Sequence, residues 1–163
     1  LPRRGSLLRA ALLRVSMPSV PFHYVDLRTF CYATEDEKRV EEALRQFLPE
    51  EYEIERAVNR GHHGDRIVVF SARVDNADDV RHVLRQLSEL SDIDDVIGEL
   101  DDRVDENCAF FLRLNKQDAF KGDVERGPGI TLRAKVEAYP AKQPAAVENA
   151  REALEQAREE AEP

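Results

Sequence analysis

The sequence has few cysteines and no long hydrophobic run. Cys31 and Cys108 are its only cysteines, and neither stands in a C-x-x-C motif or at metal-ligand spacing from a histidine. A zinc site and a disulfide are therefore not expected, whereas two buried, reduced thiols are. No apolar run approaches the ~20 residues that a membrane-spanning helix needs. The sequence thus predicts a chain that folds around an ordinary hydrophobic core.

The motifs of common enzyme classes are also missing. The chain has no G-x-G-x-x-G loop and no G-K-[ST] loop, and no serine or cysteine lies in a recognisable nucleophile elbow. His62 and His63 could act as an acid and a base, which keeps a hydrolase as one hypothesis. The acidic passage between residues 91 and 105 lacks the fixed spacing of a calcium loop. We expect no catalysis, no cofactor and no metal.

Lysine is scarce in a chain rich in acidic residues. Only five of the 24 basic residues are lysine, against 33 Asp and Glu, and the formal net charge is −9. Acid-rich, lysine-poor surfaces suit a cytoplasm of very high salt concentration, where charge repulsion is screened over a few ångströms. We therefore expect a halophilic source and a cytoplasmic location. Under such conditions the net charge says little about the partners of the protein.

The first nineteen residues differ from the rest of the chain. Arginines interrupt the leucine pairs between residues 3 and 14, so the segment does not resemble the hydrophobic region of a signal peptide. Met17 is the only methionine, which indicates that residues 1–16 are an upstream extension or else a mobile basic arm. We expect a disordered or misassigned segment at 1–19, an α+β domain at 20–140, and an acidic helix or tail at 141–163.

Hydrophobic patterns over the first half predict strands and helices in alternation. Residues 22–33 alternate as a strand, with Val25, Leu27 and Thr29 on the core face. A helix should follow, capped by Thr34 and Glu37 and ended by the proline at position 49. Residues 52–60 and 66–75 then form two more strands, and a second helix should begin after residue 75 or 76.

The second half predicts two further strands and a closing helix. The passage 91–105 reads as a solvated connector with one short helical turn at most. Strands are expected over residues 108–115 and 130–139, separated by a helical turn over 116–122. A helix over 145–161 should pack lightly or fray, because its apolar stripe is thin. The predicted fold is α+β, a mixed or antiparallel sheet of about five strands with helices on one face and a C-terminal helix.

Two glycines bracket a pair of histidines between the second and third predicted strands. Gly61 and Gly64 can adopt the positive φ that a tight reversal needs, so residues 60–66 are expected to form a hairpin tip. The arginines and backbone N–H groups of such a tip suit a phosphate. A polar surface turn without a ligand is the alternative, because glycine-flanked polar loops are common at hairpin tips.

Basic residues also recur at the outward positions of the strands, next to Phe30 and Phe111. Arginine pairs with phosphate and aromatic rings accept stacked bases, so this pattern favours RNA. Alternatively, the arginines only pair across the sheet with Glu53, Glu55 and Glu137. Lys116 and Gln117 form a second polar cluster after the fourth strand. The predicted RNA-binding residues are Arg28, Arg56, Arg60, His62, His63, Arg66, Arg73, Arg113, Lys116, Gln117, Arg133 and Lys135.

A protein-interaction module is the competing hypothesis. In that case the exposed face of the sheet, with Phe30, Tyr32 and Phe111, would be buried against a second copy of the chain. Sheet-face aromatics would serve a homodimer as well as they would serve RNA.

Four segments, taken in order, resemble the archaeal family of small RNA-binding proteins described as exosome-associated subunits. They are His23–Arg28, Ala33–Glu37, Gly61–Ile67 and Phe111–Phe120. The resemblance extends over residues 20–139. It implies an α+β fold related to the ribosomal proteins that bind 5S rRNA, no catalysis, and RNA as the partner, with the exosome or other RNA-processing proteins as further partners. The chain departs from the family pattern at Asp65-Arg66, where Asn-Pro is usual, and at Asn115, where Asp is usual.

Overall fold

The computed structural model describes residues 20–61 and 63–161 and contains one antiparallel sheet of five strands. The strand order across the sheet is β2-β3-β1-β5-β4, so β2 and β4 are the edges. The predicted α+β class and the number of strands are confirmed. The strands are β1 (Phe22–Cys31), β2 (Glu55–Arg60), β3 (Arg66–Val74), β4 (Ala109–Asn115) and β5 (Gly129–Val136).

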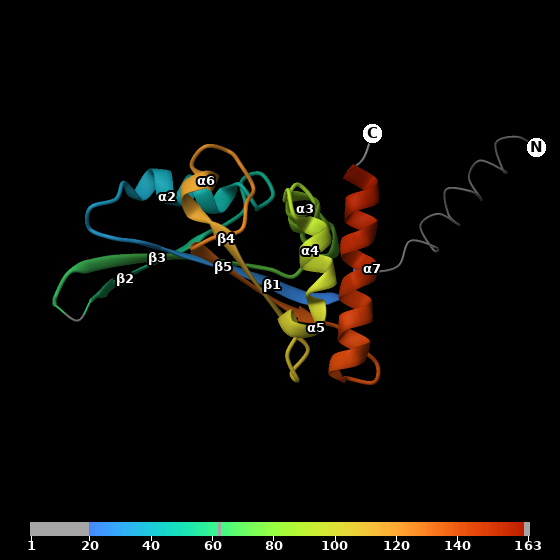
Figure 1. Cartoon of the computed structure of the whole chain (residues 1–163). Helices are drawn as coiled ribbons and strands as arrows, with labels where there is room; N and C mark the ends of the chain where they lie inside the picture. Colours follow the sequence, from blue (N-terminus) through green and yellow to red (C-terminus); the bar gives the residue numbers. More distant parts are fainter. Residues whose placement is uncertain (1–19, 62, 162–163) are drawn as a thin grey trace, which may run out of the picture.

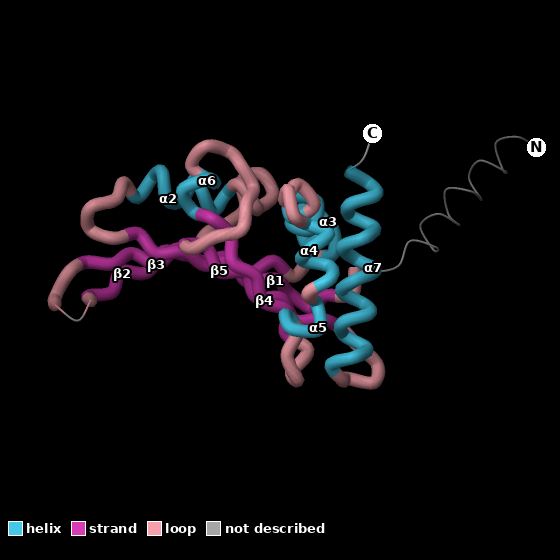
Figure 2. Tube along the Cα trace, in the orientation of Figure 1, coloured by secondary structure: helices cyan, strands magenta, loops and turns pink. Residues whose placement is uncertain are grey.

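Six helices in the described part of the chain lie on one side of this sheet. In Figure 1, α2 and α6 lie above the sheet, and α3, α4 and α7 stand side by side at its right-hand end. Figure 2 shows the β2–β3 hairpin projecting at the left, away from α7. The helices are α2 (Glu37–Arg45), α3 (Ala77–Leu87), α4 (Ile93–Gly98), α5 (Leu100–Arg103), α6 (Lys116–Ala119) and α7 (Gln143–Ala161).

Alternation along the strands gives the sheet two chemically different faces. Directly opposed residues of antiparallel strands point to the same face, so the register assigns each side chain. Val25, Leu27 and Thr29 of β1 are buried beneath the helices, as predicted. The intervening residues, among them Arg28, point to the opposite face, which we call the open face. The helix layer leaves the open face to solvent, because the helices bury only the apolar face of the sheet.

The acidic passage after α3 is not the solvated connector that its composition indicates. Residues 93–103 form α4 and α5, and Ile93, Val96, Ile97 and Leu100 are buried at the spacing i, i+3, i+4 and i+7. The aspartates between these positions face outward. The prediction of a connector is therefore wrong, because the acidic residues between the apolar ones concealed a helical stripe.

Helix α7 packs firmly against the rest of the fold. Its Ala146, Val147, Ala150, Ala153, Leu154 and Ala157 are buried and belong to the same hydrophobic cluster as the strands. The expectation that this helix packs lightly or frays is wrong. Alanine contributes little apolar area, but it lets the helix approach α3 closely, so the stripe is fully buried although it is thin.

The helix caps follow the predicted chemistry at one helix and differ at the other. Asn76 caps α3 by accepting a hydrogen bond from the backbone N–H of Asp78. Helix α2 begins later than predicted, because Asp36, not Thr34, is its N-cap and accepts from the N–H of Lys38. Glu37 therefore does not cap α2, and its carboxylate can contact other residues.

Among the described helices, none is long and apolar enough to cross a membrane. The predictions made for residues 1–19, and for His62, lie outside the residues that the structure describes.

Candidate nucleic-acid interface

The open face of the sheet carries a groove of about 950 Å³. Its floor comes from β1, β3, β4 and β5, and the segment leading into β2 forms one end. A concave surface of this size with a few polar groups is typical of ligand-binding sites. The lining side chains are Asp26, Arg28, Tyr52, Glu53, Glu55, Ser71, Arg73, Phe111, Thr131 and Arg133.

Arg73 in this groove is already neutralised. It lies directly opposite Asp26 in the β1–β3 register, and the two side chains form a bidentate ion pair at 2.7 and 2.8 Å. The guanidinium also stacks over the ring of Tyr24 at 4.0 Å from the centroid. The hydrogen bonds that Arg73 donates to the Asp26 carboxylate raise the pKa of Arg73. Arg73 therefore holds the side chains of Asp26 and Tyr24 in place and does not add an unpaired positive charge to the groove.

Arg28 and Arg133 are arranged differently. Arg28 lies 5.5 Å from the centroid of the Phe30 ring, and Arg133 lies 5.5 Å from that of Phe111. Within residues 20–61 and 63–161, no carboxylate forms an ion pair with either guanidinium. Both arginines are exposed, and Phe111 itself is 40% exposed. Each pair combines a cation with a ring, which suits a phosphate and its adjoining base.

Arg113 and Lys135 extend the basic surface along β4 and β5. Arg113 lies opposite Thr131 in the register, is exposed, and has no ion-pair partner in the described part of the chain. Lys135 donates a hydrogen bond to the backbone carbonyl of Asn107. On the open face, Arg28, Arg113, Arg133 and Lys135 are therefore cations that form no ion pair with a described carboxylate.

Three predicted site residues lie on the other side of the sheet. Arg56, Arg60 and Arg66 share the face of the β2–β3 hairpin that is directed toward the helices, because Arg56 opposes Phe70 and Arg60 opposes Arg66. Val68 and Phe70 of β3 are buried on that face. The predicted RNA-binding arginines therefore divide between the two faces of the sheet and do not form one patch.

The predicted hairpin tip is present. The N–H of Gly61 donates to the carbonyl of Asp65 at 2.6 Å, and Gly64 has a φ of +81°. Arg60 donates to the carbonyl of Gly64 at 3.3 Å, and His63 is exposed. Gly64 therefore adopts the positive φ that was predicted for the reversal, whereas Gly61 does not.

Lys116 is enclosed by the protein. It is 6% exposed, and its ammonium donates to the backbone carbonyl of Phe30 and to Glu35 Oε1, both at 2.9 Å. The ring of Tyr32 lies 5.4 Å from Nζ. Lys116 therefore joins α6 to the loop after β1, and the structure does not offer it to RNA. Gln117 on α6 is exposed.

Replacing Lys116 with methionine should lower the free energy of unfolding by about 2 kcal/mol, because the two part-buried hydrogen bonds that its charged ammonium donates are lost. The RNA affinity of the folded protein should not change. Lys121→Met is the matched control: Lys121 is exposed, and its replacement should change stability by about 0.5 kcal/mol or less. Urea unfolding measures both variants. If the folded Lys116→Met variant binds RNA more weakly than the wild type, Lys116 contributes to RNA binding and the prediction is wrong.

Asp26 and Glu37 are the residues whose importance the sequence patterns missed. Their carboxylates form ion pairs with Arg56, Arg66 and Arg73 and leave the other predicted arginines unpaired. The alternative prediction of cross-sheet pairing had named Glu53, Glu55 and Glu137 as the partners. Glu137 contacts His23 instead, at 3.3 Å. The sequence does indicate that these arginines lie on different faces. Arg66 is an even number of residues from the apolar Val68 and Phe70 and so shares their face, whereas Arg73 is an odd number away and lies on the opposite face.

The two cysteines are free and buried, as predicted. Burial, together with the neighbouring Glu35, raises the pKa of Cys31, so its thiol is held protonated. Across residues 20–61 and 63–161, no three His, Cys, Asp or Glu side chains come together in a way that could hold a metal ion.

A family model described as RNA binding matches residues 24–136 of the chain. A curated relative, the RNA-binding protein PAB1135 of Pyrococcus abyssi, is 35% identical over 144 residues. The alignment covers 82% of this chain and 94% of that protein. The matched region includes β2, β3, β4 and β5 and all of β1 except its first two residues, and therefore every arginine of the open face.

Solved archaeal structures share the fold. Mth689 from Methanothermobacter thermautotrophicus is 40% identical, with a TM-score of 0.70 over 82% of this chain and 98% of that chain. Protein AF2318 from Archaeoglobus fulgidus is 26% identical, with a TM-score of 0.72 over 81% of this chain and 99% of that chain. Helix α7 begins after the end of the family match at residue 136.

Proposed function

The chain belongs to the RNA-binding family whose model matches residues 24–136, and from this membership we propose that it binds RNA, without catalysis, through the groove on its open face. One observation carries the proposal: Arg28 and Arg133 keep their charge free over aromatic rings, on the concave face of an acidic protein. Arginine stacked on an exposed ring can meet a phosphate through its N–H groups while the ring receives an unpaired base.

The groove suits the single-stranded part of a structured RNA. An A-form duplex hides its base edges and offers mainly its phosphates and 2′-hydroxyls, whereas the unstacked bases of a loop can lie against rings such as Phe111. Ser71 and Thr131 add hydroxyl groups to the groove, and these can accept or donate hydrogen bonds to a base or a ribose. Glu53 and Glu55 close one end, so the RNA backbone should avoid that end.

We further propose a halophilic cytoplasm as the setting, since 33 acidic residues stand against five lysines. Stacking is less sensitive to salt than ion pairing, so the ring-arginine pairs are suited to that setting. Association with the exosome, and kinship of the fold with the ribosomal proteins that bind 5S rRNA, are proposals that rest on the resemblance. Homodimerisation through the open face is the competing proposal, supported by the exposed Phe111.

The test is a salt titration of a labelled RNA hairpin with a single-stranded loop. Replacing Arg28 and Arg133 together with glutamine should weaken binding about tenfold or more at 0.1 M salt and reduce the log-log salt slope by about 1.4, the value for two lost phosphate contacts. The same titration with the wild-type protein gives the reference slope.

A double variant of Arg81 and Arg85, both replaced by glutamine, is the charge-matched control. These arginines lie on α3, in the helix layer. Equal weakening in both double variants would show that binding depends on total charge and would contradict the groove. Light scattering on the same samples distinguishes the competing proposal, since a dimer held by the open face should dissociate when RNA binds.

A further inference from the structure

The β2–β3 hairpin presents a second group of arginines, apart from the groove. Arg56, Arg60 and Arg66 lie together on its helix-side face, and all six residues of β2 are exposed. β2 is an edge strand and the hairpin projects from the sheet, so this face can be reached from solvent (Figure 1). The group thus offers three guanidinium groups on an exposed arm.

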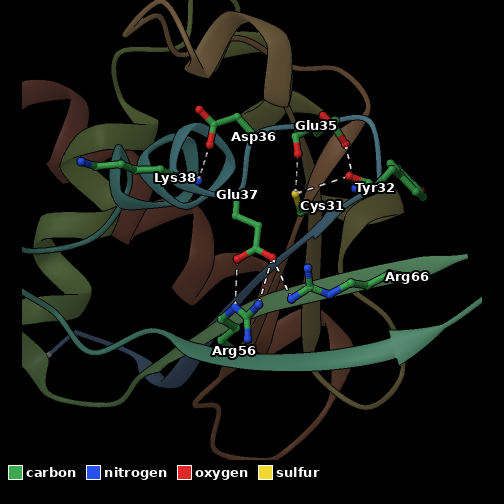
Figure 3. Close-up of polar contacts among 8 residues, drawn as sticks. All are labelled: Cys31, Tyr32, Glu35, Asp36, Glu37, Lys38, Arg56 and Arg66. Carbon is green, nitrogen blue, oxygen red and sulfur yellow. Dashed lines mark hydrogen bonds and ion pairs between the residues drawn. The ribbon is translucent and has the colours of Figure 1, made fainter.

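A single carboxylate holds two of these arginines. Glu37, in the first turn of α2, accepts from Arg56 Nε at 3.1 Å and from Arg56 Nη2 at 2.9 Å, and Arg66 Nη2 lies 3.2 Å from Glu37 Oε1 (Figure 3). The bond from Arg56 lowers the pKa of Glu37, so this carboxylate stays charged. Both oxygens are engaged, and one of them is shared by the two arginines.

This arrangement has the geometry of a phosphate contact. A phosphodiester also presents two charged oxygens to the fork of an arginine, so it can replace a carboxylate in the same contact. The exchange is accessible because the pair is open to water: the side chains of Arg56, Arg66 and Glu37 are 42%, 54% and 35% exposed. Exposed ion pairs of this kind contribute little stability and are easily exchanged.

We propose that Arg56, Arg60 and Arg66 form a second binding site for an RNA backbone phosphate, and that Glu37 occupies this site in the free protein and is displaced by the phosphate. The inference rests on the proposed function and extends it. An RNA bound in the groove would reach this second site by passing around the tip end of the β2–β3 hairpin, away from Glu53 and Glu55 at the start of β2, since the sheet separates the two sites. Glu37 would thereby weaken the binding of any polyanion that cannot supply a well-placed phosphate.

The test compares Glu37→Gln with Glu41→Gln, measured with the same labelled RNA hairpin. Both variants remove one negative charge from α2, but Glu41 pairs with Arg45 of its own helix and does not contact the hairpin. Glu37→Gln should tighten RNA binding about twofold to fivefold, the range expected for removing an exposed ion-pair competitor. Glu41→Gln should change it less than about 1.5-fold, because it alters only the net charge.

Adding Arg56→Gln and Arg66→Gln to Glu37→Gln should abolish the gain. In the otherwise wild-type protein the same pair of arginine substitutions should reduce the salt slope by about 0.7, the value for the one phosphate contact that is lost. This measurement gives an answer even if Glu37→Gln folds poorly. Equal gains in both glutamate variants, no gain, a gain that survives the arginine substitutions, or an unchanged slope would overturn the second site.

The two proposals can fail separately. If the Arg28 and Arg133 double variant loses affinity while every hairpin variant behaves as wild type, the groove stands and the second site falls. If the hairpin variants shift affinity while the groove variant does not, the second site stands and the proposed groove falls.

Discussion

Gly129→Ala should lower the free energy of unfolding by about 4 kcal/mol, combining backbone strain with overpacking. Gly129 has a φ of +120°, which side chains rarely adopt, and a Cβ there would lie 2.4 Å from Cβ of Lys116. The Gly129 carbonyl also accepts from Thr29 Oγ1 at 2.8 Å, so the position ties β5 to β1 beside α6. Urea unfolding followed by circular dichroism measures the loss.

Gly98→Ala is the control for that experiment. Gly98 ends α4, and no atom lies within 4 Å of a Cβ placed there. Because alanine favours helix over glycine, this variant should be unchanged or slightly more stable, by about 0.5 kcal/mol. If the two alanine variants unfold at the same urea concentration, the close contact at Gly129 does not constrain the fold.

Leu154→Ala should cost about 3 kcal/mol, the usual size for a leucine truncated inside a core. Leu154 is 1% exposed and lies in the same hydrophobic cluster as the strands, although α7 follows the matched family region. The variant should unfold in one cooperative transition, at a lower urea concentration than the wild type. Circular dichroism and the fluorescence of a dye attached to the protein should report the same transition. A single transition would mean that α7 folds together with residues 20–140. The predicted domain boundary at residue 140 would then have to be revised.

Glu152→Ala on the same helix is the control, because Glu152 is exposed and alanine is a strong helix former. Its stability should change by about 0.5 kcal/mol or less. A helix that only rests on the surface would give another result: Leu154→Ala would leave the main transition in place, and the α7 amides would exchange rapidly with solvent.

The main electrostatic consequence of this fold is that its carboxylates pair with some arginines and not with others. An acidic chain can still present a cationic surface if its carboxylates are withheld from one group of arginines and supplied to another. Asp26 neutralises Arg73, and Glu37 pairs with Arg56 and Arg66. Arg28 and Arg133 lie over rings and form no ion pair with a described side chain, although Arg133 is opposite Asp26 in the β1–β5 register. The net charge of −9 therefore does not describe the groove.

Helical stripes diluted by acidic or small residues were harder to predict than strands. The strands were recognised because period-two alternation places apolar residues on one face at every second position. Ile93, Val96 and Ile97 were concealed by aspartates, although their spacing is helical. Helix α7 was undervalued because four of its six buried residues are alanine, whose contribution depends on how closely a partner helix approaches.

The sequence by itself determined the class of the fold, the order of its strands, and the buried face of each strand in which apolar residues alternate, because these follow from local periodicity. It did not determine the faces of β2, whose six residues are all exposed. Only the tertiary structure decided which arginines are free. The partner of Arg73 is 47 residues away in Asp26, and that of Arg56 is 19 residues away in Glu37. Such pairs depend on strand register and on where α2 packs, and neither is encoded in the spacing of neighbouring residues.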